Sequence, residues 1–229
     1  MAAYSCALSV VIPTLNESSA LEHTLLSLQA ARKKGVQLIV VDGGSEDDTC
    51  DLAQPLVDIL DTAPRGRARQ MNHGARLASG ESILFLHADT MLPPDILALL
   101  DRWQQSKTCW GFFRVSLSGS DWRFRVIERF INWRSALFQL PTGDQAIFLR
   151  ADTFDRLDGY ADIAIMEDVE IGKRLRADHG RAYVVPAPVI TDSRRWERKG
   201  VWKTVWLMWQ LRFAYWCGTN PSELARRYQ

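Results

Sequence analysis

Asp89 lies at the end of a short apolar run and is the first residue that could carry chemistry. The run covers residues 83–86 and is followed by His87, Ala88 and Asp89. Such a run is typical of a buried strand with a polar end. Because an unpaired buried carboxylate is costly, we expect a cation beside Asp89, and carboxylate oxygens suit Mg²⁺ or Mn²⁺. The alternative is an aspartate that caps a turn before the next helix.

Two adjacent carboxylates, Glu167 and Asp168, open a predicted helix that runs to about residue 177. Acidic residues in a first helical turn offset the helix dipole and cap free N–H groups, which is a structural role. A carboxylate that faces a crevice could instead act as a general base and deprotonate a hydroxyl. Since neighbouring side chains on a helix point in different directions, we expect only one of the two to do so.

Two groups of arginines could bind phosphate. Three arginines lie in the loop 65–69, and Arg194 and Arg195 form a second pair late in the chain. Guanidinium groups match the geometry of phosphate oxygens, although a charged loop is often only a solvated surface. Together with a cation held by a carboxylate, the two cationic loops predict a diphosphate ligand.

The elements that must position these groups alternate between strand and helix. Strands are predicted at residues 8–12, 37–41, 57–60, 83–86, 110–116 and 146–149. Helices are predicted at residues 18–31, 47–52, about 70–78, 122–138 and 166–177. This alternation predicts an α/β fold with a mostly parallel sheet and helices on both faces.

Ligands of such sheets bind beyond the carboxyl ends of the strands, where the loops converge. Three polar loops follow predicted strands, namely residues 13–17, 42–45 and 87–90. We therefore expect these loops to meet in one crevice.

Composition limits the class of protein. The 229 residues include 28 basic and 27 acidic ones, for a net charge of +1, which argues against a nucleic-acid partner. Four scattered cysteines form no C-x-x-C pair, which argues against a zinc site or a disulfide framework. The first eight residues show no signal-peptide pattern, and no apolar run is long enough to cross a bilayer. We expect a cytoplasmic protein.

In order along the chain, these motifs resemble family 2 glycosyltransferases of the GT-A fold. The resemblance covers most of residues 8–176 and is carried by the segments 9–17, 40–49, 66–72, 80–90 and 167–168. The runs 142–145 and 194–197 resemble the corresponding segments of a compact bacterial subgroup of this family. The resemblance implies one domain over residues 1–229: a nucleotide-binding half to about 100, an acceptor-binding half at about 101–200, and a C-terminal helical segment at about 201–229.

The resemblance also implies an activity, which is inverting transfer of a sugar from a nucleotide diphosphate, with a UDP-sugar favoured, to an acceptor hydroxyl. Asp89 would bind Mn²⁺ or Mg²⁺, and Asp168 would be the base. The nucleotide and donor would be bound by Pro13, Thr14, Asn16, Glu17, Asp42, Gly43, Ser45, Gly66, Arg69, His87, Ala88, Arg194 and Arg195. The donor sugar and the acceptor would lie beside Gly143, Asp144, Glu167 and Trp196.

The chain departs from the family pattern at two positions. His87 stands where many relatives carry the first carboxylate of Asp-x-Asp, and Asp192 replaces the glutamine of Gln-x-x-Arg-Trp. Asp89 is then the one carboxylate securely offered to a metal, so other ligands must come from phosphates, water or a late loop.

Two alternatives to a glycosyltransferase stay open. A sugar nucleotidyltransferase normally carries a glycine-rich loop after its first strand, where this chain has residues 13–17 without glycine. A catalytically silent nucleotide-binding module would not need Asp89 and Asp168, which are both present.

Residues 122–134 and 202–216 mix tryptophan with arginine and lysine, as helices at membrane interfaces do. Aromatic stripes are usually buried, so packing on the sheet or against a second copy in a homodimer is the favoured interpretation. Peripheral contact with the inner face of a membrane is the alternative, and the acceptor would then be lipid-linked.

Overall fold

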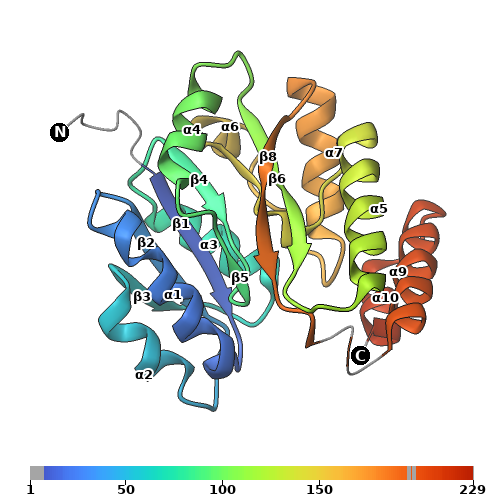
Figure 1. Ribbon diagram of the computed structural model, residues 1–229, viewed down its shortest axis with the longest axis horizontal. Coiled ribbons are helices and arrows are strands. Elements are labelled where there is room, and N and C mark those ends of the chain that lie inside the picture. The colour runs from blue at the N-terminus through green and yellow to red at the C-terminus, as the bar shows by residue number, and fades with distance from the viewer. Residues whose placement is uncertain (1–7, 195–196, 198–199, 229) are drawn as a thin grey trace.

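The computed structural model describes residues 8–194, 197 and 200–228 (Figure 1). A central sheet has the strand order β3-β2-β1-β4-β7-β6-β8-β5. Its strands are β1 (Leu8–Thr14), β2 (Gln37–Asp42), β3 (Ile59–Thr62), β4 (Ser82–Phe85), β5 (Thr90–Met91), β6 (Trp110–Leu117), β7 (Phe148–Arg150) and β8 (Tyr183–Thr191). Strands β1 to β4 pair in parallel, and so do β6 and β8, which confirms the predicted mostly parallel α/β sheet.

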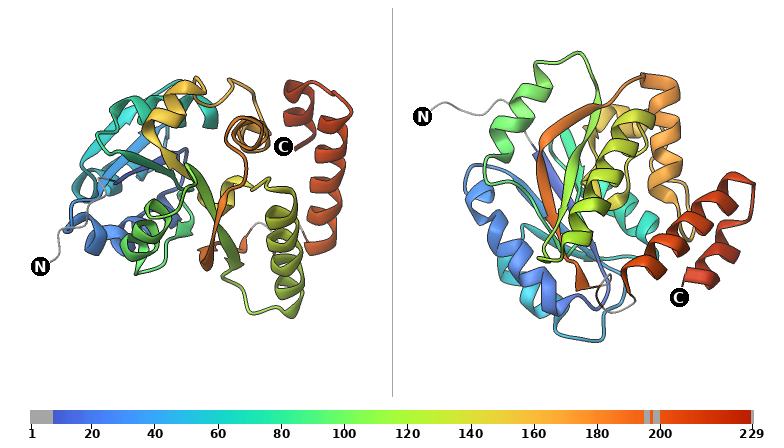
Figure 2. Two further views of the ribbon diagram at one scale, coloured as in Figure 1. Left: turned by 90° about the horizontal axis from the view of Figure 1, so that it is seen from above. Right: turned by 45° about the vertical axis from the view of Figure 1, so that its right-hand side comes forward.

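Helices cover both faces of the sheet (Figure 2). They are α1 (Ser18–Arg32), α2 (Thr49–Ala53), α3 (Arg67–Leu77), α4 (Ile96–Gln104), α5 (Trp122–Phe138), α6 (Ala151–Arg156), α7 (Glu167–His179), α9 (Val201–Trp216) and α10 (Pro221–Tyr228), with short 3₁₀ turns η1 (Gln54–Leu56) and η2 (Gly143–Gln145). One apolar core lies under α1 and α4, and a second lies under α3, α6 and α7. The sheet is therefore buried between two helical layers, as its continuous apolar strands require.

Two predicted strands begin later than expected. Residues 54–56 form η1, which contains Pro55, so strand β3 starts at Ile59. Ala146 ends η2 with a positive φ of 44°, so strand β7 starts at Phe148. In both cases a 3₁₀ turn lies immediately before the predicted strand and delays its start.

The pairing of β5 with β8 was not predicted. Strand β5 has two residues, and Thr90 pairs with Thr191. Strand β8 contains Pro186 and Pro188, which disfavour a strand when the sequence is considered alone. The backbone N–H of Asp192 donates to the carbonyl of Asp89 at 3.1 Å, so this pairing brings the late loop beside the predicted cation site.

Of the two favoured interpretations of the aromatic residues of α5 and α9, packing on the sheet is wrong for most of them, whereas packing against a second copy in a homodimer stays a prediction. Trp122 and Trp133 of α5 and Trp202, Trp206 and Trp216 of α9 are more than half exposed. Within the part of the chain that the structure describes, no helix is long and apolar enough to cross a membrane. The described fold therefore leaves these side chains largely exposed to solvent.

Helix α3 lies close to the sheet at Gly74. An added Cβ there would lie 2.4 Å from Val11 Cγ1 and 3.0 Å from Val41 Cγ2. We expect Gly74→Ala to lower the free energy of unfolding by about 1–3 kcal/mol, because an overpacked core must shift. Urea denaturation followed by circular dichroism would measure the change.

Gly172 of α7 provides a matched control for this prediction, because it is also a buried glycine inside a helix. A Cβ at Gly172 would meet nothing closer than 3.5 Å. We expect Gly172→Ala to be neutral or stabilising, since alanine is favoured over glycine in helices by about 1 kcal/mol. Equal destabilisation by the two variants would contradict the packing argument.

Candidate functional site

Three polar loops meet where neighbouring strands end. Strands β2, β1 and β4 are adjacent in the sheet, and Thr14 pairs with Asp42 at the ends of β1 and β2. The loops 13–17, 42–45 and 87–90 follow these three strands. The predicted convergence of the three loops is therefore confirmed.

Asp42 shapes the loop after β2. Its Oδ2 accepts from the backbone N–H groups of Gly44 and Ser45, both at 2.7 Å. Its Oδ1 accepts from the Ser45 hydroxyl at 2.5 Å and the Thr14 hydroxyl at 3.3 Å. Burial by itself would raise the pKa of Asp42, but these hydrogen bonds hold that pKa below its usual value. The carboxylate is thus satisfied by the protein, and contact with a nucleotide base would require one of these bonds to open.

The loop after β1 is joined to the loop after β2. The N–H of Asn16 donates to the Ser45 hydroxyl at 2.8 Å, and the Asn16 side chain accepts from the N–H of Glu46 at 2.9 Å. Asn16 has a positive φ of 53°, which is uncommon outside glycine. Pro13 pairs with Val41 inside the sheet. These contacts hold two of the predicted nucleotide-binding loops as one unit.

Gln70 is a buried residue of this region to which the sequence assigned no role. Its Nε2 donates to the carbonyls of Thr14 and Val41 at 2.7 and 2.8 Å. Its side chain also lies against Gly43, where an added Cβ would be 3.0 Å from Oε1. Gln70 therefore joins the ends of β1 and β2 from helix α3, and its only signal in the sequence is its place within the segment 66–72.

Asp89 is partly buried and incompletely paired. Among the described residues, the one hydrogen bond to its carboxylate comes from the Thr90 hydroxyl at 3.2 Å. Burial raises the pKa of Asp89, and the nearby His87 opposes that rise. A partly buried carboxylate with so few hydrogen-bond donors could accommodate a cation, and the cation at Asp89 stays a prediction.

His87 lies between two carboxylates. Its Nδ1 is 2.9 Å from Asp144 Oδ1. Burial lowers the pKa of His87, but the hydrogen bond to Asp144 and the charges of Asp144 and Asp89 outweigh burial and raise it. The other ring nitrogen lies over Gly143, where an added Cβ would be 2.6 Å from Nε2. Ala88, between His87 and Asp89, is buried.

The described part of the protein offers a cation at Asp89 too few ligand atoms by itself, so a cation there would also have to be bound by a ligand molecule. Within residues 8–194, 197 and 200–228, no three His, Cys, Asp or Glu side chains gather closely enough to hold a metal ion. Mg²⁺ and Mn²⁺ commonly take one or two carboxylates together with phosphate oxygens and water. Asp89 can supply the carboxylate, and the remaining ligands would come from a diphosphate.

Glu167 and Asp168 point in different directions and contact different partners. Glu167 is 3% exposed and forms an ion pair with Arg67 at 3.2 Å. Asp168 accepts from the N–H of Gly143 at 2.8 Å and from the N–H of Val169 at 2.7 Å. Burial raises the pKa of Glu167, and Arg67 opposes that rise. Both carboxylates border a small pocket that also includes His87 and Gly143.

The turn η2 places Gly143 and Asp144 between His87 and Asp168. It is held by Gln145, which is fully buried. Gln145 Oε1 accepts from Thr142 N at 3.1 Å and from Ser135 Oγ at 2.6 Å, and its Nε2 donates to the carbonyl of Phe113 at 3.0 Å. These hydrogen bonds tie the turn to strand β6 and to helix α5. The site therefore depends on elements from the later part of the chain as well as on the loops after β1, β2 and β4.

Of the arginines in the loop 65–69, a different one from the predicted Arg69 lies at the pocket. Arg67 reaches the pocket through Glu167, whereas Arg69 pairs with Asp162 at 2.8 Å in an exposed contact. Gly66, with φ at 144°, is the residue immediately before helix α3, which begins at Arg67. The sequence could not distinguish Arg67 from Arg69, because the choice depends on the rotation of α3 against the sheet. Arg69 uses its Nε in the pair with Asp162, so the other N–H groups of its guanidinium could contact a nucleotide while the pair stays closed.

The late loop reaches the start of helix α1, directly after the first loop of the site. Arg194 Nη1 donates to the Ser19 hydroxyl at 2.7 Å, and its Nε lies 2.5 Å from Asp192. Burial and the charge of Asp89 raise the pKa of Glu17, and Arg194 opposes that rise. Glu17, Asp89 and Arg194 are therefore electrostatic neighbours. Arg195 and Trp196, which were also predicted at the site, lie outside the described residues.

The sequence profile described as glycosyl transferase family 2 matches residues 9–156. This chain belongs to that family. The segment 9–156 contains the three strand-end loops, Gln70, Asp89 and the turn η2. The predicted family is thereby confirmed.

Known proteins agree with this assignment. The glycosyltransferase is 31% identical over 173 residues to an uncharacterised glycosyltransferase of Mycobacterium tuberculosis, a match that covers 71% of this chain and 66% of the relative. Its fold is similar to that of residues 1–349 of S. aureus TarS in complex with UDP, with a TM-score of 0.66 and 16% identity over 81% of this chain and 60% of that TarS fragment. It is also similar to a mannosyltransferase from Pyrobaculum calidifontis in complex with GDP-Man and Mn²⁺, with a TM-score of 0.66 and 20% identity over 91% of this chain and 61% of that protein. The predicted GT-A fold is confirmed, and the chain spans less than two thirds of each relative.

Proposed function

We propose that this glycosyltransferase moves a sugar from a nucleotide diphosphate, a UDP-sugar in the first instance, to an acceptor hydroxyl with inversion. One observation carries the proposal. Asp168 accepts from the N–H of Gly143, the His87 ring lies over Gly143, and the charge of His87 acts on Asp89. One carboxylate is thus available to a diphosphate-bound cation and the other to an acceptor. UDP in TarS and GDP-Man with Mn²⁺ in the mannosyltransferase are consistent with this division.

In the proposed reaction, Asp168 takes the proton of the acceptor hydroxyl as its oxygen attacks the anomeric carbon. The bond between that carbon and the phosphate oxygen breaks, and the nucleotide diphosphate leaves with the electron pair. Because attack comes from the face opposite the leaving group, the configuration inverts. Gly143 N–H and Val169 N–H hold the Asp168 carboxylate in place for this step.

Positive charge near the diphosphate has two sources in this proposal. A divalent cation bound at Asp89 would neutralise part of the negative charge of the departing diphosphate. Arg194 lies beside Glu17 and Ser19 on the same side of the sheet, and its positive charge can neutralise a further part. His87, which is hydrogen-bonded to Asp144, would orient the turn that carries Gly143 beside the donor sugar.

A thermal-shift panel of UDP, GDP, CDP and ADP, each with and without MnCl₂, tests the nucleotide and the metal together. We expect one diphosphate to raise the Tm only when Mn²⁺ is present. Saturation at one hundred times Kd stabilises by about 2.7 kcal/mol, which corresponds to several degrees for a chain of this size. If no diphosphate gives a metal-dependent shift, the proposal fails.

The same panel extended to UTP and GTP separates the alternative activity. A sugar nucleotidyltransferase uses a nucleoside triphosphate as substrate, so it would be stabilised most by a triphosphate. Preference for the diphosphate supports the glycosyltransferase, in agreement with the loop Pro13–Glu17, which contains no glycine.

A further inference from the structure

Exposed hydrophobic side chains are concentrated on helices α5 and α9. Among the described residues, all large hydrophobic side chains that are strongly exposed lie on these two helices, except Leu26 and Ile190. The exposed fractions on α9 lie between 57% and 79%. Exposed patches of this kind usually mark an interaction site.

The exposed side chains form a stripe on each helix. On α9 they recur at steps of four and three residues, namely Trp202, Trp206, Trp209, Phe213 and Trp216. On α5 the stripe consists of Trp122, Val126, Phe130, Trp133 and Leu137, and Phe138 is exposed as well. Such steps place the side chains on one side of a helix. We call the ten residues of the two stripes the aromatic face.

The two stripes are continuous with each other. Phe130 of α5 stacks on Trp209 of α9, with ring centroids 5.5 Å apart and planes inclined by 26°. The opposite sides of the helices are buried: Phe124 and Ile127 of α5 pack with Leu117, and Leu211 of α9 packs with Val169. The aromatic face is therefore not available to the protein's own core.

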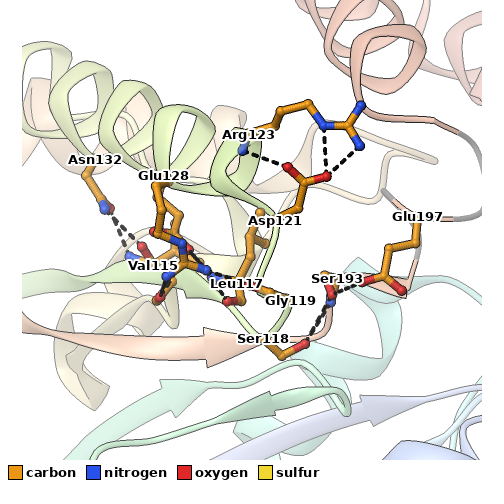
Figure 3. A network of polar contacts seen from close by, with 12 residues as sticks. Val115, Leu117, Ser118, Gly119, Asp121, Arg123, Glu128, Asn132, Ser193 and Glu197 are labelled. Carbon is orange, nitrogen blue, oxygen red and sulfur yellow. Dashed lines mark hydrogen bonds and ion pairs between the residues drawn. The ribbon is translucent and has the colours of Figure 1, made fainter.

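Hydrogen bonds hold α5 firmly on the sheet (Figure 3). Glu128 accepts from the N–H of Leu117 at 2.5 Å, and the Asn132 amide bonds both the N–H and the carbonyl of Val115 at 2.9 Å. In the same network, Ser193 donates to Glu197 at 2.7 Å in the segment that leads to α9. The aromatic face is thus presented on a fixed support.

The charge around the aromatic face is positive. Helices α5, α9 and α10 together carry eight basic and two acidic residues, a net charge of +6, compared with +1 for the whole chain. Five of the eight basic residues are exposed, namely Arg125, Arg129, Lys203, Arg226 and Arg227. One of the acidic residues, Glu128, is buried. Arg129 and Lys203 are exposed, and each stands one helical turn from a tryptophan of the face. Rings beside arginine and lysine suit a headgroup layer that carries negative charge.

A second copy of this chain is a poorer partner for the same surface. A twofold homodimer buries the same patch of both copies. It would bring two cationic surfaces together, and like charges across an interface are repulsive. An anionic lipid surface covers the rings and also neutralises the charge.

We propose that the aromatic face docks this glycosyltransferase on an anionic lipid bilayer. The rings lie at the level of the headgroups, and Arg129 and Lys203 lie beside lipid phosphates. Helices α5, α9 and α10 occupy the side of the molecule away from α1 and α2 (Figures 1 and 2). Through Leu211, α9 also packs on the start of α7, which carries Asp168. If Asp168 is the base proposed above, docking brings the acceptor side of the site to the bilayer.

Co-sedimentation with vesicles tests the docking, independently of any transfer activity. We expect the protein to pellet with phosphatidylcholine vesicles that contain phosphatidylglycerol, and much less with phosphatidylcholine alone. Added NaCl should weaken binding, since charge is part of the attraction. Absence of binding to the anionic vesicles at low salt would overturn the proposal.

Variants locate the docking surface. We expect the double variant Trp202→Ser and Trp206→Ser to bind anionic vesicles about tenfold more weakly or worse, because both rings leave the headgroup layer. Both side chains are exposed, so the fold should survive, and circular dichroism checks this. Leu26→Ser, which changes an exposed leucine of α1, should bind as the unchanged protein does. Equal binding by the tryptophan variant would overturn the proposal.

Sedimentation equilibrium without vesicles tests whether the aromatic face binds a second copy of the chain instead of lipid. The proposal expects a monomer. A dimer that the tryptophan variant converts to monomer would assign the aromatic face to a homodimer and overturn lipid docking.

Discussion

Replacing Asp168 with asparagine is expected to eliminate most sugar transfer while nucleotide binding stays nearly unchanged. General-base catalysis contributes about 10²–10⁴-fold, so kcat should fall by that factor. An asparagine oxygen can still accept from the N–H of Gly143, which now bonds the carboxylate at 2.8 Å. The geometry of the turn η2 should therefore survive. Transfer assays and the diphosphate thermal shift measure the two properties separately.

Glu170→Gln is the matched control for this variant. Glu170 lies in the first turn of the same helix and pairs with Arg174 at 2.6 Å. Because that pair is partly exposed, its loss should cost no more than about 1 kcal/mol and should leave transfer unchanged. If Asp168→Asn loses nucleotide binding and thermal stability together with transfer, Asp168 is a structural cap and the assignment as base is wrong.

Replacing Asp89 with asparagine is expected to abolish the part of the diphosphate thermal shift that depends on Mn²⁺. Asparagine keeps the size of the side chain and can accept from Thr90, which bonds Asp89 at 3.2 Å. It lacks the charge that would hold the cation, so several degrees of metal-dependent stabilisation should disappear.

The same variant should not reduce the stability of the protein without ligand. Burial raises the pKa of Asp89 in the folded state. At a pH above that pKa, the ionised carboxylate therefore costs stability, and a neutral asparagine removes the cost. We expect the Tm without ligand to be equal or higher at pH 8.

Asp61→Asn provides the control, since Asp61 is also a carboxylate near the end of a strand but pairs with His73 at 2.7 Å. It should leave the Mn²⁺-dependent shift intact. If Asp89→Asn retains that shift, the metal binds elsewhere. If the Tm of Asp89→Asn without ligand falls sharply, Asp89 has a structural role and stabilises the turn before the next helix.

The convergence of the loops was predictable because it follows from chain order and periodicity. Apolar runs of four or five residues separated by helical patterns specify parallel strands, and the polar residues after them must then lie at one edge. The loops after β1, β2 and β4 do so. The same local pattern predicted α5 at residues 122–138, with the bounds that the structure has.

The position of the late loop was not predictable in this way. It depends on the pairing of Thr90 with Thr191 and on the contact of Arg194 with Ser19, a residue 175 positions away. Strand β8 contains two prolines and β5 has two residues, so neither has a clear pattern of its own. Only the packing of the whole sheet brings them together.

The sequence by itself determined the kinds of group at the site and the strands that carry them, since these depend on residue type and short-range spacing. Tertiary structure decided their partners: Asp144 for His87, Gly143 for Asp168, and Arg67 for Glu167. It also decided that the aromatic stripes of α5 and α9 are exposed, although their spacing alone suits a core. The physical reason is common to both, because partners and burial arise from contacts between distant segments that periodicity does not encode.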